Sequence, residues 1–251
     1  MKPIAICQHH PAQGPGYLLD FLNQRALPWR LFRLEDGTPT GMQDYSGVVI
    51  LGSPASVNDG ASWIRREALL VQDALERNKP VLGHCFGGQL LAHVLGAPVR
   101  RNPVPQIGWG KVQVTQHADA KRWFGPLREL ALFHWHFDTF GIPRRATRVL
   151  FGHYCLNKGF AYGPHLGLQS HLEVTAESIR DWCALDGHEL LDHAGPSVQT
   201  EAQIMHRLDE RLALLHQLAD RVYTRWIQAL SPALAATRPQ GGPGWGMALS
   251  G

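Results

Sequence analysis

A glycine-flanked cysteine between a predicted strand and a predicted helix constrains this chain most. Residues 79–93 read KPVLGHCFGGQLLAH, a short apolar run that passes through glycines into residues typical of a helix. Gly83 and Gly87 each lie two residues from Cys85, which gives a nucleophile room in a strained strand-to-helix bend. We expect Cys85 to be exposed at a helix N-terminus, where backbone N–H groups favour a thiolate. A buried, inert cysteine is the alternative.

Strands and helices alternate along the first part of the chain. We predict strands at 3–7, 29–34, 48–51 and 80–83, and helices at 17–24 and 62–78. This alternation predicts an α/β fold with a mostly parallel sheet flanked by helices and right-handed crossovers. In such sheets the site lies at the carboxyl ends of the strands. Gly52 and Cys85 both follow predicted strands, so we expect them at the same edge.

The second part of the chain is predicted to form a mixed sheet region and then helices. The predicted strands are 97–101, 111–115, 131–134, 147–152, 155–160 and 166–169, and residues 106–110 are predicted to connect two of them. A helical turn is predicted at 119–124, a helix at 176–185 and a longer helix at 201–230. The last is predicted as one long C-terminal helix because its apolar residues recur at steps of three and four. We expect a single domain over residues 1–251, with 201–230 as an appended helix and 231–251 as a frayed tail.

Composition and charge argue against several classes of protein. The formal net charge is +3 and the basic residues are scattered, so nucleic acid is not an expected partner. The four cysteines form no CxxC pair, and the 14 histidines show no HExxH spacing. We therefore predict no disulfide framework, no metal site and no cofactor. No apolar run approaches a membrane span and the N-terminus does not suit a signal peptide, so we expect a cytoplasmic protein.

His171 and Glu173 are the candidate partners of Cys85. A thiol nucleophile needs a base to move its proton, and a third group to orient that base. The pair follows a predicted strand, and residues two apart in a strand end point to the same side. A bare HxE pair more often lies on a solvated face, but downstream of a Gly-x-Cys-x-Gly bend it gains a chemical role.

Four segments of the chain together resemble one protein family. GHCFGGQ at 83–89, ILGSPASV at 50–57, HWHFDTF at 134–140 and GLQSHLEVT at 167–175 resemble class I glutamine amidotransferase domains in order and approximate spacing. The closest likeness is to the glutaminase part of GMP synthase and its free-standing relatives. The resemblance covers roughly residues 2–179.

The resemblance implies a Cys85, His171 and Glu173 triad that hydrolyses the side-chain amide of glutamine. It also implies oxyanion donors in the Gly52-Ser53 loop and at Phe86, a substrate contact from Gln89, and a loop around Trp135 and His136 that grips the amino-acid end. For His136, a packed or hydrogen-bonded structural role is the alternative. The chain has Gly88, Leu172 and Phe137 where the family commonly has His, Pro and Gly, which bears on substrate preference.

Three functions follow from these observations. The first is a glutamine amidohydrolase that releases ammonia through a cysteinyl thioester, as a stand-alone amidotransferase or a glutaminase subunit. The second is a γ-glutamyl peptidase or hydrolase with the same triad, and the third is a non-enzymatic binding or redox-sensing protein. No P-loop or SGGxDS-like phosphate motif occurs, and too few residues follow Glu173 for an ATP-using domain. We therefore expect any ammonia acceptor to be bound by a separate synthetase chain.

Overall fold

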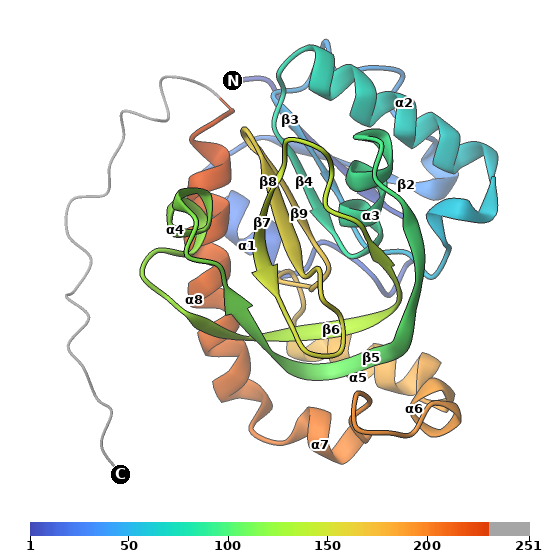
Figure 1. Ribbon diagram of the computed structural model, residues 1–251. Helices are drawn as coiled ribbons and strands as arrows, with labels where there is room; N and C mark the ends of the chain where they lie inside the picture. Colours follow the sequence, from blue (N-terminus) through green and yellow to red (C-terminus); the bar gives the residue numbers. More distant parts are fainter. Residues whose placement is uncertain (231–251) are drawn as a thin grey trace.

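A nine-stranded sheet with helices on both faces organises the computed structural model, which describes residues 1–230 (Figure 1). The strands are β1 (Ile4–Gln8), β2 (Trp29–Arg33), β3 (Gly47–Ile50), β4 (Val81–His84), β5 (Val99–Val114), β6 (Glu129–Phe140), β7 (Thr147–Phe151), β8 (Gly159–Tyr162) and β9 (His165–Leu168). Their order across the sheet is β2-β1-β3-β4-β9-β8-β7-β5-β6. The strands from β2 to β9 pair in parallel, and those from β9 to β6 pair antiparallel. The predicted α/β class with flanking helices is confirmed, and the later strands form the expected mixed region.

The helices cover the two faces of this sheet. They are α1 (Tyr17–Gln24), α2 (Ser62–Glu76), α3 (Phe86–Val94), α4 (Ala118–Phe124), α5 (Ala176–Asp186), α6 (His188–Asp192), α7 (Glu201–Met205) and α8 (Leu208–Ile227), with single 3₁₀ turns at Leu34–Asp36 and Val57–Asp59. Successive strand residues point to opposite faces. Ile4 and Ile6 of β1 therefore join the core under α1 and α8, whereas Ala5 and Cys7 join the core under α2 and α3. The sheet is thus buried on both sides.

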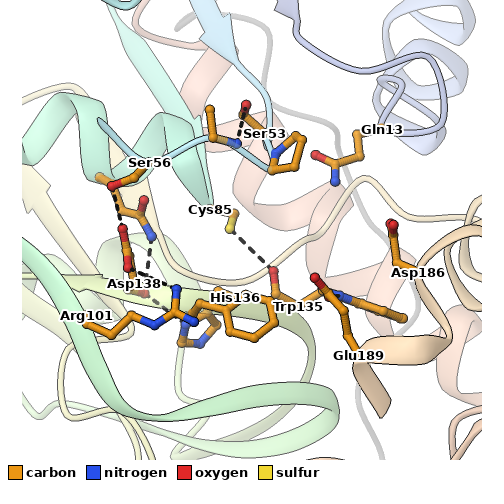
Figure 2. Close-up of a pocket in the computed structure, with 14 residues that line it drawn as sticks. Gln13, Ser53, Ser56, Cys85, Arg101, Trp135, His136, Asp138, Asp186 and Glu189 are labelled. Carbon is orange, nitrogen blue, oxygen red and sulfur yellow. Dashed lines mark hydrogen bonds and ion pairs between the residues drawn. The ribbon is translucent and has the colours of Figure 1, made fainter. Parts of the chain in front are cut away.

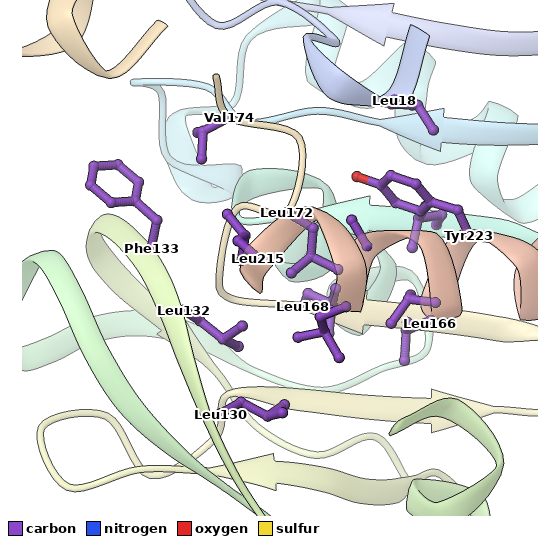
Figure 3. Packing of buried hydrophobic residues seen from close by; sticks show 14 of the residues in the cluster. Leu18, Leu130, Leu132, Phe133, Leu166, Leu168, Leu172, Val174, Leu215 and Tyr223 are labelled. Atoms are coloured by element: carbon purple, nitrogen blue, oxygen red, sulfur yellow. The ribbon is translucent and has the colours of Figure 1, made fainter. Parts of the chain in front are cut away.

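Helix α8 closes one of the two cores. Its buried face includes Leu215 and Tyr223, which lie over Leu166 and Leu168 of β9 in Figure 3. The 20-residue helix carries its apolar residues at helical spacing, so this face points continuously at the sheet. It covers the strand that leads directly to His171.

We expect Leu215→Ala to destabilise the protein by about 2–5 kcal/mol, because the leucine is 1% exposed and its loss leaves a cavity. The neighbouring Leu214 is 66% exposed, and Leu214→Ala should change the unfolding free energy by about 0.5 kcal/mol or less. Urea unfolding of the two variants measures the difference. Equal effects would contradict the placement of α8.

The antiparallel part of the sheet differs from the sequence expectation. The predicted strands 97–101 and 111–115 belong to one strand, β5, and residues 106–110 pair with β6 instead of forming a connection. The pairing register shifts between Arg101 and Gln106, where Pro103 and Pro105 lie. Such a bulge accommodates residues without a ladder N–H, so the prolines interrupt the pairing but not the strand. β6 likewise continues beyond the predicted 131–134 to Phe140.

Two further boundaries were predicted wrongly. The single helix predicted over 201–230 is two helices, α7 and α8, because Arg207 adopts a left-handed conformation with φ 52° between them. The apolar periodicity runs across this break because Ile204 and Leu208 bury in the same core. Residues 155–158 precede β8 and are not part of a strand. The frayed tail predicted for 231–251 lies outside the described residues, and the single-domain division stays a prediction.

Among residues 1–230, no helix has the combination of length and apolar character needed to cross a membrane.

Candidate active site

Cys85 occupies a strained bend between β4 and α3. Its φ is 50° and its ψ is −106°, a positive-φ conformation that is uncommon for a residue with a side chain. The flanking glycines are needed for space: a Cβ at Gly83 would lie 2.3 Å from the Gly87 carbonyl, and one at Gly87 would lie 2.0 Å from the carbonyl oxygen of Ile50. The strand–bend–helix predicted from the sequence is therefore present, with Cys85 at the N-cap of α3.

The expected exposure of Cys85 is wrong, because the residue is only 5% exposed. Strands that are distant in sequence cover it. The Cys85 Sγ lies 3.7 Å from the backbone oxygen of Trp135 on β6, and the side-chain amide of Gln169, just after β9, donates to Sγ at 3.6 Å. The bend alone would present the sulfur to solvent, but tertiary packing buries it.

His171 and Glu173 form a buried pair directly after β9. The His171 Nδ1 lies 2.7 Å from the Glu173 Oε1, and the two residues are 1% and 3% exposed. The backbone on both sides is fixed, because the His171 N–H donates to Phe133 of β6 and the Glu173 carbonyl accepts from the Tyr17 N–H. The other ring nitrogen of His171, Nε2, has no hydrogen-bond partner among the described residues.

The charges around His171 determine its protonation. Burial by itself lowers the pKa of His171, but the negative charges of Glu173 and of the Cys85 sulfur outweigh it and raise this pKa to about 10. For Glu173, burial favours a higher pKa, but His84 and His171 together hold the pKa of the carboxyl below its ordinary value. The pair is therefore suited to an imidazolium next to a carboxylate, with its free Nε2 available as a proton donor.

His84 is a third member of this cluster that the sequence analysis missed. Its Nδ1 lies 3.1 Å from the Glu173 Oε2, although neither atom makes a hydrogen bond by geometry. His84 is fully buried, and burial lowers its pKa. It precedes Cys85 at the end of β4, so its position next to the cysteine was the available signal.

A pocket of about 130 Å³ opens at Cys85 (Figure 2). Its lining comes from the loop after β3, the β6 strand and the α5–α6 region, and it includes Gln13, Ser53, Pro54, Ala55, Ser56, Cys85, Gln89, Arg101, Trp135, His136, Phe137, Asp138, Asp186 and Glu189. Five of the predicted site residues, Ser53, Cys85, Gln89, Trp135 and His136, are thus brought together. Gly52, Phe86, His171 and Glu173 are not among the lining residues.

The remaining predicted residues have defined places around the sulfur. Phe86 is buried and forms the first residue of α3, whose leading N–H groups have no partner within the helix. Gln89 donates from Nε2 to the Asp138 backbone oxygen at 3.2 Å and to the Gln169 Oε1 at 3.4 Å. These contacts hold the Gln89 amide against the pocket wall.

Trp135 and His136 lie on β6, and the loop expected around them is wrong. Both residues pair with β5, so the pocket wall is a strand. The Trp135 indole donates to Glu189 at 2.6 Å, which links this wall to α6. His136 is 3% exposed, with Nδ1 3.0 Å from the Asp138 backbone oxygen and Nε2 3.2 Å from the Lys158 Nζ. It combines a pocket position with the structural role that we considered as its alternative.

Lys158 is a buried cation that the sequence analysis also missed. Its side chain contacts Gln106 and His136 and is fully buried. No carboxylate among the described residues lies within ion-pair distance of it. Burial lowers the pKa of Lys158 to about 8, against the opposing influence of Cys155 and Cys85. A buried ammonium group therefore lies next to His136, which lines the Cys85 pocket.

We expect Gly52→Ala to lower turnover by about 10²-fold, because small displacements of a reacting group have effects of this size. A Cβ at Gly52 would lie 2.9 Å from the His171 Cε1 and would push the imidazole aside. Gly14→Ala is the matched control, since its Cβ would make an ordinary 3.6 Å contact with Gln8. Steady-state kinetics of folded protein compares them, and equal activities would argue against this packing.

The raised pKa of His171 predicts a pH-dependent contribution to stability. The ordinary value is 6.5 and the folded value is about 10, so the stabilisation is complete below pH 6.5 and is lost as the pH rises towards 10. The difference in unfolding free energy between the wild type and His171→Asn should therefore shrink over this interval. Urea titrations at several pH values measure it, and a difference that grows with pH would have the wrong sign.

Within residues 1–230, no group of three or more His, Cys, Asp or Glu side chains is arranged to hold a metal ion.

Comparisons with known proteins identify the family of this chain. Residues 18–180 match the model of the family described as "Glutamine amidotransferase class-I". A glutamine amidotransferase from Methylobacillus flagellatus has a crystal structure that is similar to this chain, with a TM-score of 0.89, 37% identity and coverage of 92% of this chain and 96% of that one.

Two curated proteins are similar in sequence over most of their length. The glutamine amidotransferase-like protein YfeJ of Salmonella typhimurium is 26% identical over 74% of this chain and 82% of its own. Gamma-glutamyl peptidase 3 of Arabidopsis thaliana is 30% identical over 65% of this chain and 71% of its own. On the family match and the structural similarity, this chain belongs to the glutamine amidotransferase class-I family.

Proposed function

We propose that this protein hydrolyses the side-chain amide of glutamine through a cysteinyl thioester. The observation that carries the proposal is the buried His171–Glu173 pair, with Nδ1 2.7 Å from Oε1, at the edge of the sheet where Cys85 occupies a strained positive-φ bend at the N-terminus of α3. A nucleophile, a base and a group that orients the base are the components that acyl transfer requires.

The proposed reaction has two halves. The Cys85 sulfur attacks the amide carbon, His171 gives its proton to the departing ammonia, and a γ-glutamyl thioester forms. Water then attacks the thioester with His171 as base, which releases glutamate and restores the thiol. The raised pKa of His171 supports this assignment, because a protonated imidazole is needed when the nitrogen leaves.

The pocket supplies candidates for substrate binding. The backbone N–H groups of Ser53 and Phe86 are the proposed donors to the oxyanion, and such a donor is typically worth about 10²–10³ in rate. Gly52 leaves room for the imidazole next to them. Gln89 and the Trp135–His136 wall are proposed to contact the amino-acid part of the substrate. If the ammonia is used in synthesis, we propose that its acceptor is bound by a separate synthetase chain.

A γ-glutamyl peptidase activity is the second candidate. It is favoured by the similarity to a protein named gamma-glutamyl peptidase 3, and it would use the same thioester with an amine as leaving group. The pocket is lined by Arg101, Asp138, Asp186 and Glu189, so charged groups surround the space where a larger substrate would extend.

The test compares kcat/KM for L-glutamine with kcat/KM for γ-glutamyl dipeptides, with release of ammonia and of the free amino acid as readouts. A preference for glutamine supports the amidohydrolase, and a preference for the peptides supports the peptidase. Absence of turnover with both substrate classes by folded protein would contradict both, and would favour a non-enzymatic binding or redox-sensing role.

A further inference from the structure

A buried histidine and glutamate hold the loop that follows β3. His9, in the segment after β1, lies with Nδ1 2.9 Å from the Gly52 backbone oxygen and with Nε2 2.8 Å from the Glu67 Oε2. Glu67 belongs to α2, and the two side chains are 1% and 4% exposed. Neither residue lines the Cys85 pocket or belongs to the proposed triad. A buried polar pair with this partner needs a role other than direct chemistry.

The contact with Gly52 fixes the orientation of one peptide group. A carbonyl oxygen can only accept a hydrogen bond, so the His9 Nδ1 carries a proton and donates to the Gly52 oxygen. This holds whether the proton between the His9 Nε2 and Glu67 lies on the nitrogen or on the carboxyl oxygen. The peptide between Gly52 and Ser53 is trans, as no cis peptide bond occurs in the described residues. In a planar trans peptide, the N–H points opposite to the C=O. The Ser53 N–H therefore points away from His9.

That direction is the one the chemistry needs. Ser53 lines the pocket together with Cys85 (Figure 2), whereas the Gly52 carbonyl accepts a hydrogen bond from His9, which does not line the pocket. A donor is useful to an oxyanion only if it is aimed before the charge develops. The hydrogen bond behind the peptide prevents the opposite orientation, which would present the Gly52 oxygen to a developing negative charge.

His9 is itself rigidly held. Its ring lies 5.0 Å from the Trp63 ring and 5.1 Å from the Phe86 ring, and both nitrogens are engaged. Phe86 follows Cys85 and carries the second proposed donor. One imidazole thus contacts Phe86 and the carbonyl of the peptide group that carries the Ser53 N–H.

We propose that Glu67 and His9 are positioning residues that aim the Ser53 N–H at the oxyanion formed during attack by Cys85. This inference rests on the proposed function. The pair acts only through the Gly52–Ser53 peptide and touches no substrate, so its effect belongs to the transition state. A purely structural pair would instead affect the amount of folded enzyme.

The decisive variant is the double exchange His9→Phe with Glu67→Leu. Phenylalanine retains an aromatic ring between Trp63 and Phe86, and removing both polar partners avoids an unpaired buried carboxylate. Glu67→Gln is the conservative variant, because its amide can still bond one nitrogen of His9 while the other donates to Gly52. Glu76→Leu, at an exposed position of α2, is the matched control.

Two reactions of Cys85 distinguish a misplaced oxyanion donor from a general disturbance of the site. Hydrolysis of L-glutamine or of γ-glutamyl-p-nitroanilide passes through an oxyanion, whereas alkylation by iodoacetamide does not. For the double variant we expect kcat/KM to fall about 10²-fold, mainly in kcat, as for loss of an oxyanion donor. Alkylation should stay within about threefold of the wild type, as should hydrolysis by Glu67→Gln and Glu76→Leu.

The outcomes are distinguishable. Wild-type hydrolysis rates in the folded double variant, or equal losses in hydrolysis and alkylation, would overturn the positioning role. The positioning role would also be overturned if the double variant contained fewer molecules with a reactive Cys85 but each of them kept the wild-type kcat. If the wild type hydrolyses neither substrate, the proposed function fails first and the inference fails with it. If the double variant does not fold, His9→Phe with Glu67→Gln is measured against the same expectations, because it also removes the donor to Gly52 and leaves a neutral amide in place of the buried carboxylate.

Discussion

Cys85→Ala should lower the hydrolysis of glutamine and of γ-glutamyl substrates by at least about 10⁴-fold, the size of loss expected when a nucleophile of an acyl-transfer site is removed. No described residue near the pocket offers a second thiol, since Cys7, Cys155 and Cys183 do not line it. The fold should be retained, because alanine occupies the 5% exposed position without new contacts. Steady-state kinetics measures the loss of hydrolysis, and the midpoint of urea unfolding shows whether the variant keeps the fold.

Cys183→Ala is the control for this exchange. Cys183 is also buried and lies on α5, outside the pocket lining, so its loss should leave kcat/KM within about threefold of the wild type. If Cys85→Ala were as active as Cys183→Ala, Cys85 could not be the nucleophile.

Glu173→Gln should have the second largest effect, a loss of about 10³–10⁴-fold in kcat/KM, as for the loss of the orienting carboxylate in other triads. The amide can donate to the His171 Nδ1, which would place the remaining proton on Nε2 and leave no base facing Cys85. It also removes the carboxylate charge that, together with the Cys85 sulfur, raises the pKa of His171 to about 10. NMR titration of His171 in the variant should show this pKa moving down.

Glu177→Gln provides the comparison, because Glu177 is an exposed residue in the first turn of α5. It should leave both the activity and the titration of His171 unchanged. A Glu173→Gln enzyme with wild-type kcat/KM would contradict an orienting role for the carboxylate, whatever the titration shows.

The parallel half of the fold could be predicted because local patterns suffice there. The glycines around Cys85 and the short apolar runs such as 48–51 are local signals, and the structure places each in the expected strand or bend. The antiparallel half depends on pairing between distant strands. The predicted strand ended at residue 101, but β5 continues through Pro103 and Pro105, where its pairing with β6 shifts register as a bulge.

The surroundings of the site were less predictable than its polar core. The sequence order indicated Cys85, His171 and Glu173, but burial of the cysteine results from Trp135 and Gln169, which are far along the chain. The partners His9 and Glu67 carry no spacing signal, because they come from two different elements. Contacts between polar groups that form only through tertiary packing cannot be predicted from the periodicity of the sequence.

The most direct test of the central claim is a search for the acyl-enzyme. Rapid mixing of the protein with L-glutamine or a γ-glutamyl peptide, an acid quench and mass spectrometry of the digested chain would locate the adduct. We expect a γ-glutamyl thioester on the peptide that contains Cys85, lost on treatment with hydroxylamine and absent from Cys85→Ala. Turnover without any adduct on Cys85, or an adduct on another residue, would contradict the mechanism.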